Sequence, residues 1–158
     1  MYKQLLYTFK MSEKNHTNIA TFIHLSTFSR FLIPFGNFLG PLVLWIINKD
    51  KSQFIDEHGK QALNFQISIL IYSLVIGLIT IPFFAFSILN GFDFMDFNLF
   101  DGIHLNISKP SPLFYIGGSL GFLAVIGFIL EIVFIIKASL RARDGDVYNY
   151  PLSIKFLK

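Results

Sequence analysis

Two long runs of apolar, almost uncharged residues dominate the pattern of hydrophobic and polar positions along the chain. The first, residues 65–89, contains no charge, and a helix needs about 20 residues to cross the hydrocarbon of a membrane. The second, residues 113–136, contains a single charge, Glu131. The pattern therefore predicts two full transmembrane helices, within segments 52–89 and 113–140.

The first third of the chain is apolar as well, but it is interrupted. Residues 17–33 are apolar with scattered polar positions, and residues 38–48 form a second apolar piece, which as a helix is about 16 Å long. Between them, Pro34 lacks a backbone donor and disfavours helix at the residue before it, while Gly36 and Asn37 readily form turns. We therefore expect the helix to break at these three residues.

Two topologies fit residues 17–48: one long kinked span, or a helical hairpin that enters and leaves on the same side of the membrane. Basic residues favour the cytoplasmic side. Three of them lie in segment 1–16, three in 49–60 and five in 137–158, against one in segment 90–112. The count favours the hairpin, with both chain termini on the cytoplasmic side of a cytoplasmic (inner) membrane.

The predicted fold class is an all-α integral membrane protein, a small helical bundle with a broken N-terminal hairpin and two full transmembrane helices. We expect a cytoplasmic tail over residues 1–16 and one membrane domain over 17–158. The membrane domain is expected to contain four apolar segments (17–33, 38–48, 52–89 and 113–140), an outer loop (90–112) and a C-terminal tail (141–158). The tail shows no signal peptide. Met11 offers an alternative start, so residues 1–10 are either native or a misassigned extension.

Composition supports a membrane location. The chain is 53% hydrophobic and 15% charged, whereas soluble domains carry about 25% charged residues. It has no cysteine, which excludes disulfides and thiolate metal sites. The net charge of +3 resides at segment ends and forms no basic stripe, which argues against nucleic acid. The expected partners are membrane lipid and either other integral membrane proteins or a second copy of the chain.

A stripe of polar residues, Glu57, Gln61, Asn64, Ser68 and Tyr72, steps by four, three, four and four positions along the second apolar helix. This spacing places them on one helical face. Unsatisfied polar groups are costly in lipid, so such residues bond across helices or line a wet cavity. We favour interhelical contacts and keep a polar solute path as the alternative.

The last apolar helix carries a face of small residues, Gly117, Gly121 and Ala124, which permits close helix packing. Seven positions beyond Ala124 the same face reaches Glu131, and a membrane acid usually points into the bundle. His24 enters the membrane from the same side to about the same depth. We therefore predict that Glu131 pairs with His24, with Asn64 and Ser68 as other candidate partners. The alternative is that Glu131 reaches the inner interface.

Other ionisable residues give weaker signals. Arg30 is expected near the outer end of the first helix, with its head group extended to the interface. The cluster Asp56-Glu57-His58 fits a helix start better than a metal or acid–base site, because adjacent helical positions point in different directions. An intramembrane metal enzyme would need metal near His58 or His24. Walker, GxGxxG, HExxH and GxSxG motifs are missing, so no catalytic residue, cofactor or metal is predicted.

The segment between the two long apolar runs is rich in phenylalanine and aspartate. Exposed aromatic residues in water usually mark a contact surface. We expect this outer loop to touch a partner protein or the outer lipid surface through four side chains: Phe92, Phe94, Phe97 and Phe100.

Two stretches resemble a known family: IPFGNFLGPLVLWIINKDKSQFIDEHGKQALNFQIS (33–68) and IKASLRARDGDVYNYPLSIKF (136–156). They resemble the bacterial membrane family catalogued as domain of unknown function 4870, which is distantly similar to the twenty-kilodalton component of the chloroplast inner-envelope import machinery. The resemblance covers about residues 17–158 and implies a four-segment helical bundle without an agreed activity. The chain departs from the pattern in its long loop 90–112 and in Glu131.

These observations predict a non-catalytic accessory or structural subunit of a larger membrane assembly. Protein translocation is the favoured context by analogy alone. The alternative is a small transporter or channel lined by the polar stripe and Glu131, and an intramembrane metal-dependent enzyme is a third interpretation.

Overall fold

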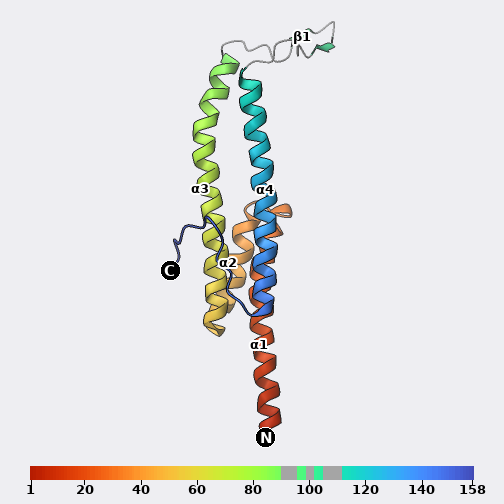
Figure 1. The fold of residues 1–158 in the computed structure, drawn as a ribbon, viewed down its shortest axis with the longest axis vertical. Coiled ribbons are helices and arrows are strands. Elements are labelled where there is room, and N and C mark those ends of the chain that lie inside the picture. Colours follow the sequence, from red (N-terminus) through yellow and green to blue (C-terminus); the bar gives the residue numbers. More distant parts are fainter. Residues whose placement is uncertain (90–95, 99–101, 105–111) are drawn as a thin grey trace. The chain divides into compact units, whose positions relative to one another are not determined.

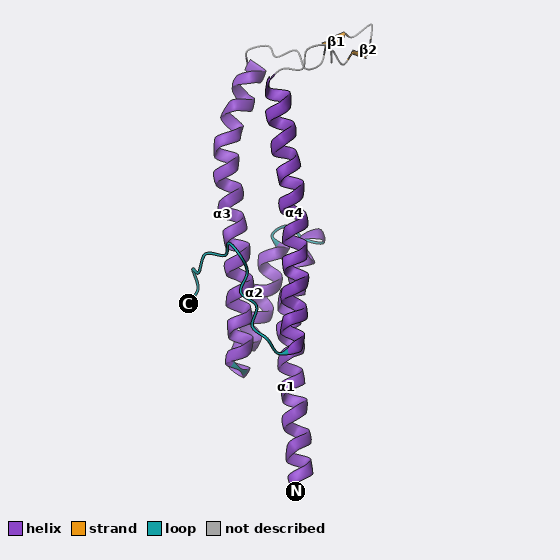
Figure 2. Cartoon of the chain, in the orientation of Figure 1, coloured by secondary structure: helices purple, strands orange, loops and turns teal. Residues whose placement is uncertain are grey.

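The computed structural model describes residues 1–89, 96–98, 102–104 and 112–158, and the chain is predominantly helical (Figures 1 and 2). The helices are α1 (Tyr2–Leu25), the 3-10 helix η1 (Ser26–Phe31), α2 (Gly36–Asn48), the short 3-10 turn η2 (Lys49–Lys51), α3 (Gln53–Leu89) and α4 (Pro112–Asp144). Two short strands, β1 (Asp96–Asn98) and β2 (Gly102–His104), lie between α3 and α4 in the sequence. This description agrees with the helical fold class that the sequence predicts.

The chain divides into two compact units. The first contains Met1–Ile71 and Leu130–Lys158, and the second contains Tyr72–Ile129. Helices α3 and α4 each contribute residues to both units.

In the first unit, the chain reverses between α1 and α2, which lie side by side (Figure 1). The hydroxyls of Ser26 and Thr27 donate to carbonyls three residues earlier, where α1 gives way to η1. Phe35 then adopts a left-handed conformation, with φ of 58°, and α2 begins at the next residue, Gly36. A Cβ at Gly36 would lie 2.3 Å from the carbonyl oxygen of Ser29, so only glycine fits this close approach.

The helix boundaries differ from the predicted segments. Helix α1 begins at Tyr2, so the predicted tail 1–16 is helical and largely exposed. The turn is shorter than predicted, because Gly36 and Asn37 already belong to α2 and only Pro34 of the three break residues precedes it. Helix α4 continues to Asp144.

The start of α3 follows the usual chemistry of a helix N-terminus. The Ser52 hydroxyl accepts the backbone N–H of Ile55 at 3.2 Å, and Asp56 lies in the first turn. A carboxylate there interacts favourably with the positive end of the helix. This position explains the acidic cluster Asp56-Glu57-His58 without a metal.

The core of the first unit consists of two apolar clusters. One joins α3, α4 and the C-terminal segment through Phe65, Ile135, Ala138 and Tyr150. The other joins α1 to the first part of α3 through Ile23, Ile55 and Ala62. These clusters hold the buried polar residues described below.

The second unit contains the end of α3, the two strands and the start of α4. The strands pair antiparallel, with Phe97 opposite Ile103, where the sequence had suggested a loop without regular structure. The described helical residues of this unit expose many large apolar side chains, among them Leu74, Leu78, Ile79, Phe122 and Leu123. Such surfaces suit contact with lipid or with another protein.

Two helical stretches are long and apolar enough to cross a membrane by length and composition, Gln53–Pro82 and Tyr115–Asp144. They lie in the two regions that the apolar runs of the sequence predict. Helix α2 has 13 residues, about 20 Å of helix, and is too short for the same role.

Candidate functional site

The first unit buries several polar side chains. Nine polar or charged residues whose side chains are described are buried there, and we call them the buried polar cluster: His24, Thr27, Asn48, His58, Asn64, Gln66, Ser68, Glu131 and Ser139. A buried polar group is costly unless it is hydrogen-bonded. The partners of these residues therefore show what the cluster does.

Glu131 forms an ion pair with Arg30. The distance from Arg30 Nη1 to Glu131 Oε2 is 2.8 Å, and the side chains are 26% and 6% exposed. Gln66 Nε2 donates to the other carboxylate oxygen at 3.4 Å, and Asn37 Nδ2 donates to Gln66 Oε1 at 2.8 Å. The network joins η1, α2, α3 and α4.

This pairing corrects the prediction that Glu131 pairs with His24 and that Arg30 extends to the outer interface. The sequence analysis treated residues 17–33 as one α-helix, but the last part is the 3-10 helix η1, which turns its side chains differently. Arg30 therefore reaches α4. A guanidinium also suits a buried carboxylate better than an imidazole does, since it is always charged and carries several donors.

His24 instead belongs to a chain of three rings. Its Nε2 lies 2.8 Å from His58 Nδ1, and its Nδ1 lies 2.9 Å from the hydroxyl of Tyr150. His24 and His58 are fully buried. The chain connects α1, α3 and the C-terminal segment.

The donors and acceptors of this chain depend on the tautomers of the two imidazoles. Burial raises the pKa of the Tyr150 phenol well above its usual value, and Tyr148 and Glu131 raise it further. Tyr150 therefore keeps its proton and can donate it to His24 Nδ1, its only hydrogen-bond partner within the described part of the chain. His58 Nε2, which is buried, has no hydrogen-bond partner among the described atoms.

The C-terminal segment is held on α3 by side chains that bond to its backbone. Asn64 Oδ1 accepts the N–H groups of Phe156 and Leu157 at 3.1 and 2.8 Å, and its Nδ2 donates to the Leu157 carbonyl at 3.0 Å. Ser68 Oγ accepts the Ile154 N–H at 2.8 Å. Figure 2 shows this segment as a loop that runs beside α3. Because these bonds reach main-chain atoms, they hold the segment independently of its side chains.

The other members of the predicted polar stripe have different surroundings. Gln61 Nε2 donates to Asn149 Oδ1 at 2.8 Å, again in the C-terminal segment. Glu57 accepts from Gln53 within α3 itself, on the exposed side of that helix. Tyr72 belongs to the second unit and is 37% exposed. The stripe therefore contacts mainly the C-terminal segment, where the sequence analysis expected another helix.

Two of the three residues on the predicted small-residue face of α4 show no close packing in the described chain. Gly121 and Ala124 are exposed, and a Cβ at Gly121 would meet no described atom within 4 Å. Gly117 is half-buried. Glu131 is buried in the first unit, whereas these three residues belong to the second.

Two further sets of predicted residues give no site here. Phe92, Phe94 and Phe100 lie outside the described residues, and Phe97 belongs to β1 but its side chain is not described. Within the described ranges, no group of three or more His, Cys, Asp or Glu side chains could hold a metal ion.

Sequence reasoning missed two members of the buried polar cluster, His58 and Gln66, and three partners of its members, Arg30, Asn37 and Tyr150. Tyr150 lies in a segment without helical or strand periodicity, which gave no reason to place it in the core. Asn37 and Gln66 had one available signal, since both are amides in otherwise apolar segments.

A comparison with protein-family models matches residues 15–157 to the magnetosome magnetite crystal formation protein family. This finding corrects the earlier resemblance, because the matching family is neither domain of unknown function 4870 nor the chloroplast import component. The comparison with curated proteins gives no match. The comparison with solved structures gives none either.

Proposed function

Since the chain belongs to the magnetosome magnetite crystal formation protein family, we propose that it is a non-catalytic membrane protein that supports magnetite formation as an accessory component of the magnetosome membrane. The observation that carries the proposal is the family match, which covers residues 15–157 and so includes the whole buried polar cluster. The two apolar helices, Gln53–Pro82 and Tyr115–Asp144, support the membrane location.

The contacts of the cluster support an accessory role over a transport path. Glu131 is occupied by Arg30 and Gln66, and Asn64 and Ser68 are occupied by the backbone of the C-terminal segment. Polar groups that line a path must be free to exchange partners with the solute. These groups instead hold parts of the chain together.

The orientation that we propose places both termini and the α2–α3 connection on the cytoplasmic side. The support is the concentration of basic residues in segments 1–16, 49–60 and 137–158. Residues 90–111, which connect the two long helices in sequence, then face the opposite side. Lipid and other membrane proteins are the proposed partners, whereas protein translocation rested on the corrected resemblance and is not proposed.

Complementation tests this function. The chain is produced in a magnetite-forming bacterium whose native gene for a member of this family has been deleted. The magnetite crystals are then measured by electron microscopy. We expect the number and size of the crystals to return toward those of the parent strain. If the chain reaches the membrane and the crystals still match those of the deletion strain, the proposed function is wrong.

A matched variant separates loss of function from poor expression. Ser119→Ala changes an exposed residue of α4 whose hydroxyl donates to the Ile116 carbonyl of the same helix, and it should complement as the unchanged chain does. A flux assay in liposomes addresses the alternative, since an accessory protein should add no ion conductance to the vesicles.

A further inference from the structure

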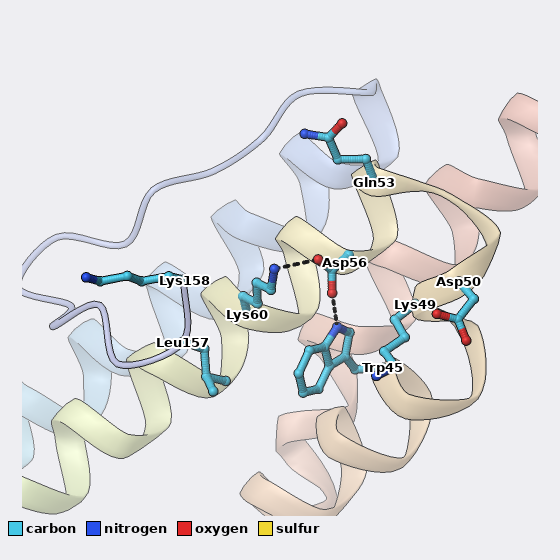
Figure 3. Close-up of a pocket in the computed structure, with 8 residues that line it drawn as sticks. All are labelled: Trp45, Lys49, Asp50, Gln53, Asp56, Lys60, Leu157 and Lys158. Atoms are coloured by element: carbon cyan, nitrogen blue, oxygen red, sulfur yellow. Dashed lines mark hydrogen bonds and ion pairs between the residues drawn. The ribbon is translucent and has the colours of Figure 1, made fainter.

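A hollow of about 540 Å³ opens beside the start of α3 in the first unit (Figure 3). Its wall combines the end of α2, η2, the first turns of α3 and the C-terminal segment. The residues that matter for its chemistry are one aromatic and five charged side chains: Trp45, Lys49, Asp50, Asp56, Lys60 and Lys158. Trp45 is the only tryptophan of the sequence.

Part of this charge is neutralised within the hollow. Asp56 accepts the indole N–H of Trp45 at 2.8 Å and pairs with Lys60 at 2.6 Å, and Figure 3 shows both contacts. The hydrogen bond holds the indole ring of Trp45 at the wall. The ion pair cancels the charges of Lys60 and Asp56, so this pair does not attract a charged ligand.

The remaining charge is positive. In the described part of the chain, neither Lys49 nor Lys158 forms an ion pair with a carboxylate. Lys49 Nζ lies 5.6 Å from the centre of the Trp45 ring, within the range of a cation–π contact. Among the charged side chains of the wall outside the Asp56–Lys60 pair, the two lysines Lys49 and Lys158 outnumber the one acid, Asp50, so the positive side chains there can attract a phosphate.

An apolar surface leads to the hollow. Leu39, Val43 and Ile46 are 44%, 50% and 53% exposed, and their spacing of four and three places them on one face of α2. The next positions on that face are Lys49 and Asp50, which line the hollow. From Leu39 to Lys49 the helix rises about 15 Å, half of the roughly 30 Å of membrane hydrocarbon.

We propose that the hollow binds the phosphate headgroup of an anionic glycerophospholipid, with an acyl chain along the exposed face of α2. Lys49 and Lys158 hold the phosphate, and Asp50 accepts a headgroup hydroxyl. A free phosphate ion would use the same lysines but would leave the apolar face without an occupant. This site goes beyond the proposed role in magnetite formation and does not depend on it.

Trp45 makes the site directly measurable. The full chain in a neutral detergent is titrated with short-chain phosphatidylglycerol, and the emission of Trp45 is recorded. We expect a saturable change, with a half-saturating concentration that rises about tenfold or more in the double variant Lys49→Gln/Lys158→Gln. Lys49→Arg/Lys158→Arg keeps both charges and should keep the affinity.

The matched control is Lys3→Gln/Lys10→Gln, which removes the same charge from exposed positions of α1 and should leave the titration unchanged. Inorganic phosphate and short-chain phosphatidylcholine are titrated in parallel, and each should need at least about a tenfold higher concentration. Native mass spectrometry of retained lipid checks each variant independently of Trp45 emission. Equal half-saturation in the two glutamine variants would overturn the site, and saturation by inorganic phosphate at the lipid concentration would overturn the lipid as its source.

Discussion

Arg30 Nη1 and Glu131 Oε2 lie 2.8 Å apart although their residues are 101 positions apart in the sequence. The pair connects η1, in the turn of the N-terminal hairpin, to α4. Glu131 is nearly buried, so loss of Arg30 would leave a buried charge without a partner. Arg30 is partly exposed, so loss of Glu131 would leave a charge that can reach water. This difference makes the pair a sensitive test of how the buried polar cluster works.

Removal of Arg30 or Glu131 alone should destabilise the protein. Removal of both should lower the free energy of unfolding by less than the sum of the two single effects. Arg30→Met leaves a buried carboxylate without a cation and should lower the free energy of unfolding by about 3 kcal/mol. Glu131→Leu should cost less, because Arg30 can extend toward water. Glu131→Gln keeps one acceptor oxygen but turns the other into a donor that faces Arg30 or Gln66, so it should cost about 1–3 kcal/mol. Thermal unfolding in detergent measures the unchanged chain, these three variants and the double variant Arg30→Met/Glu131→Leu, and additivity of the Arg30→Met and Glu131→Leu costs within about 0.5 kcal/mol would show that the pair does not couple.

Asn64 should anchor the C-terminal segment. Asn64→Leu removes three hydrogen bonds to the backbone of Phe156 and Leu157, at a cost of about 2 kcal/mol. Hydrogen exchange of the amides of residues 154–157 should accelerate, while exchange in the middle of α3 should not. Leu78→Ala, at an exposed position of the same helix in the second unit, is the control. Unchanged protection of residues 154–157 in Asn64→Leu would exclude the anchoring role.

Two glycine substitutions should have opposite outcomes. A Cβ at Gly36 would lie 2.3 Å from the Ser29 carbonyl oxygen, whereas one at Gly121 would meet no described atom within 4 Å. Gly36→Ala should therefore destabilise the protein by about 1–3 kcal/mol, the usual range for overpacking. Gly121→Ala should be neutral or slightly stabilising, since alanine favours helix. Equal melting temperatures for the two variants would contradict the close contact between η1 and α2.

The sidedness of the chain can be measured because the sequence has no cysteine. Single cysteines replace Lys14, Ser52, Asn98 and Lys158, and intact cells are treated with a membrane-impermeant thiol reagent. Only the Asn98 position should react, since the basic segments favour the cytoplasmic side. A reaction at Lys14 would exclude the hairpin and favour one kinked span over residues 17–48.

The sequence was sufficient for the features that depend on local pattern. Uncharged runs of adequate length predicted the two long helices, and Pro34 predicted the turn before α2, although α1 itself ends earlier, at Leu25. The start of α3 at Ser52 and Asp56 follows from helix-capping preferences. Each of these features is decided by residues that are close together in the chain.

The contacts inside the first unit depend on geometry that the pattern does not contain. The pairing of Glu131 was assigned to His24 because η1 was not recognised, and a 3-10 helix has no signature that separates it from the end of an α-helix. The C-terminal segment has no periodicity, and Asn64 and Ser68 bind its backbone, which every sequence provides. The sequence can predict which helical face carries such polar groups, but it cannot predict which segment they bind.

The most direct test of a structural role for the buried polar cluster is magnetite formation supported by the double variant Arg30→Met/Glu131→Leu. The variant is produced in the magnetite-forming strain that lacks its own family member, and crystal sizes are compared with those supported by the unchanged chain. Because the double change removes both charges without leaving one unpaired, a structural pair predicts crystals of the unchanged size. Crystals that match those of the deletion strain, despite a double variant that is folded and in the membrane, would contradict the account and show that the charges themselves are needed for function.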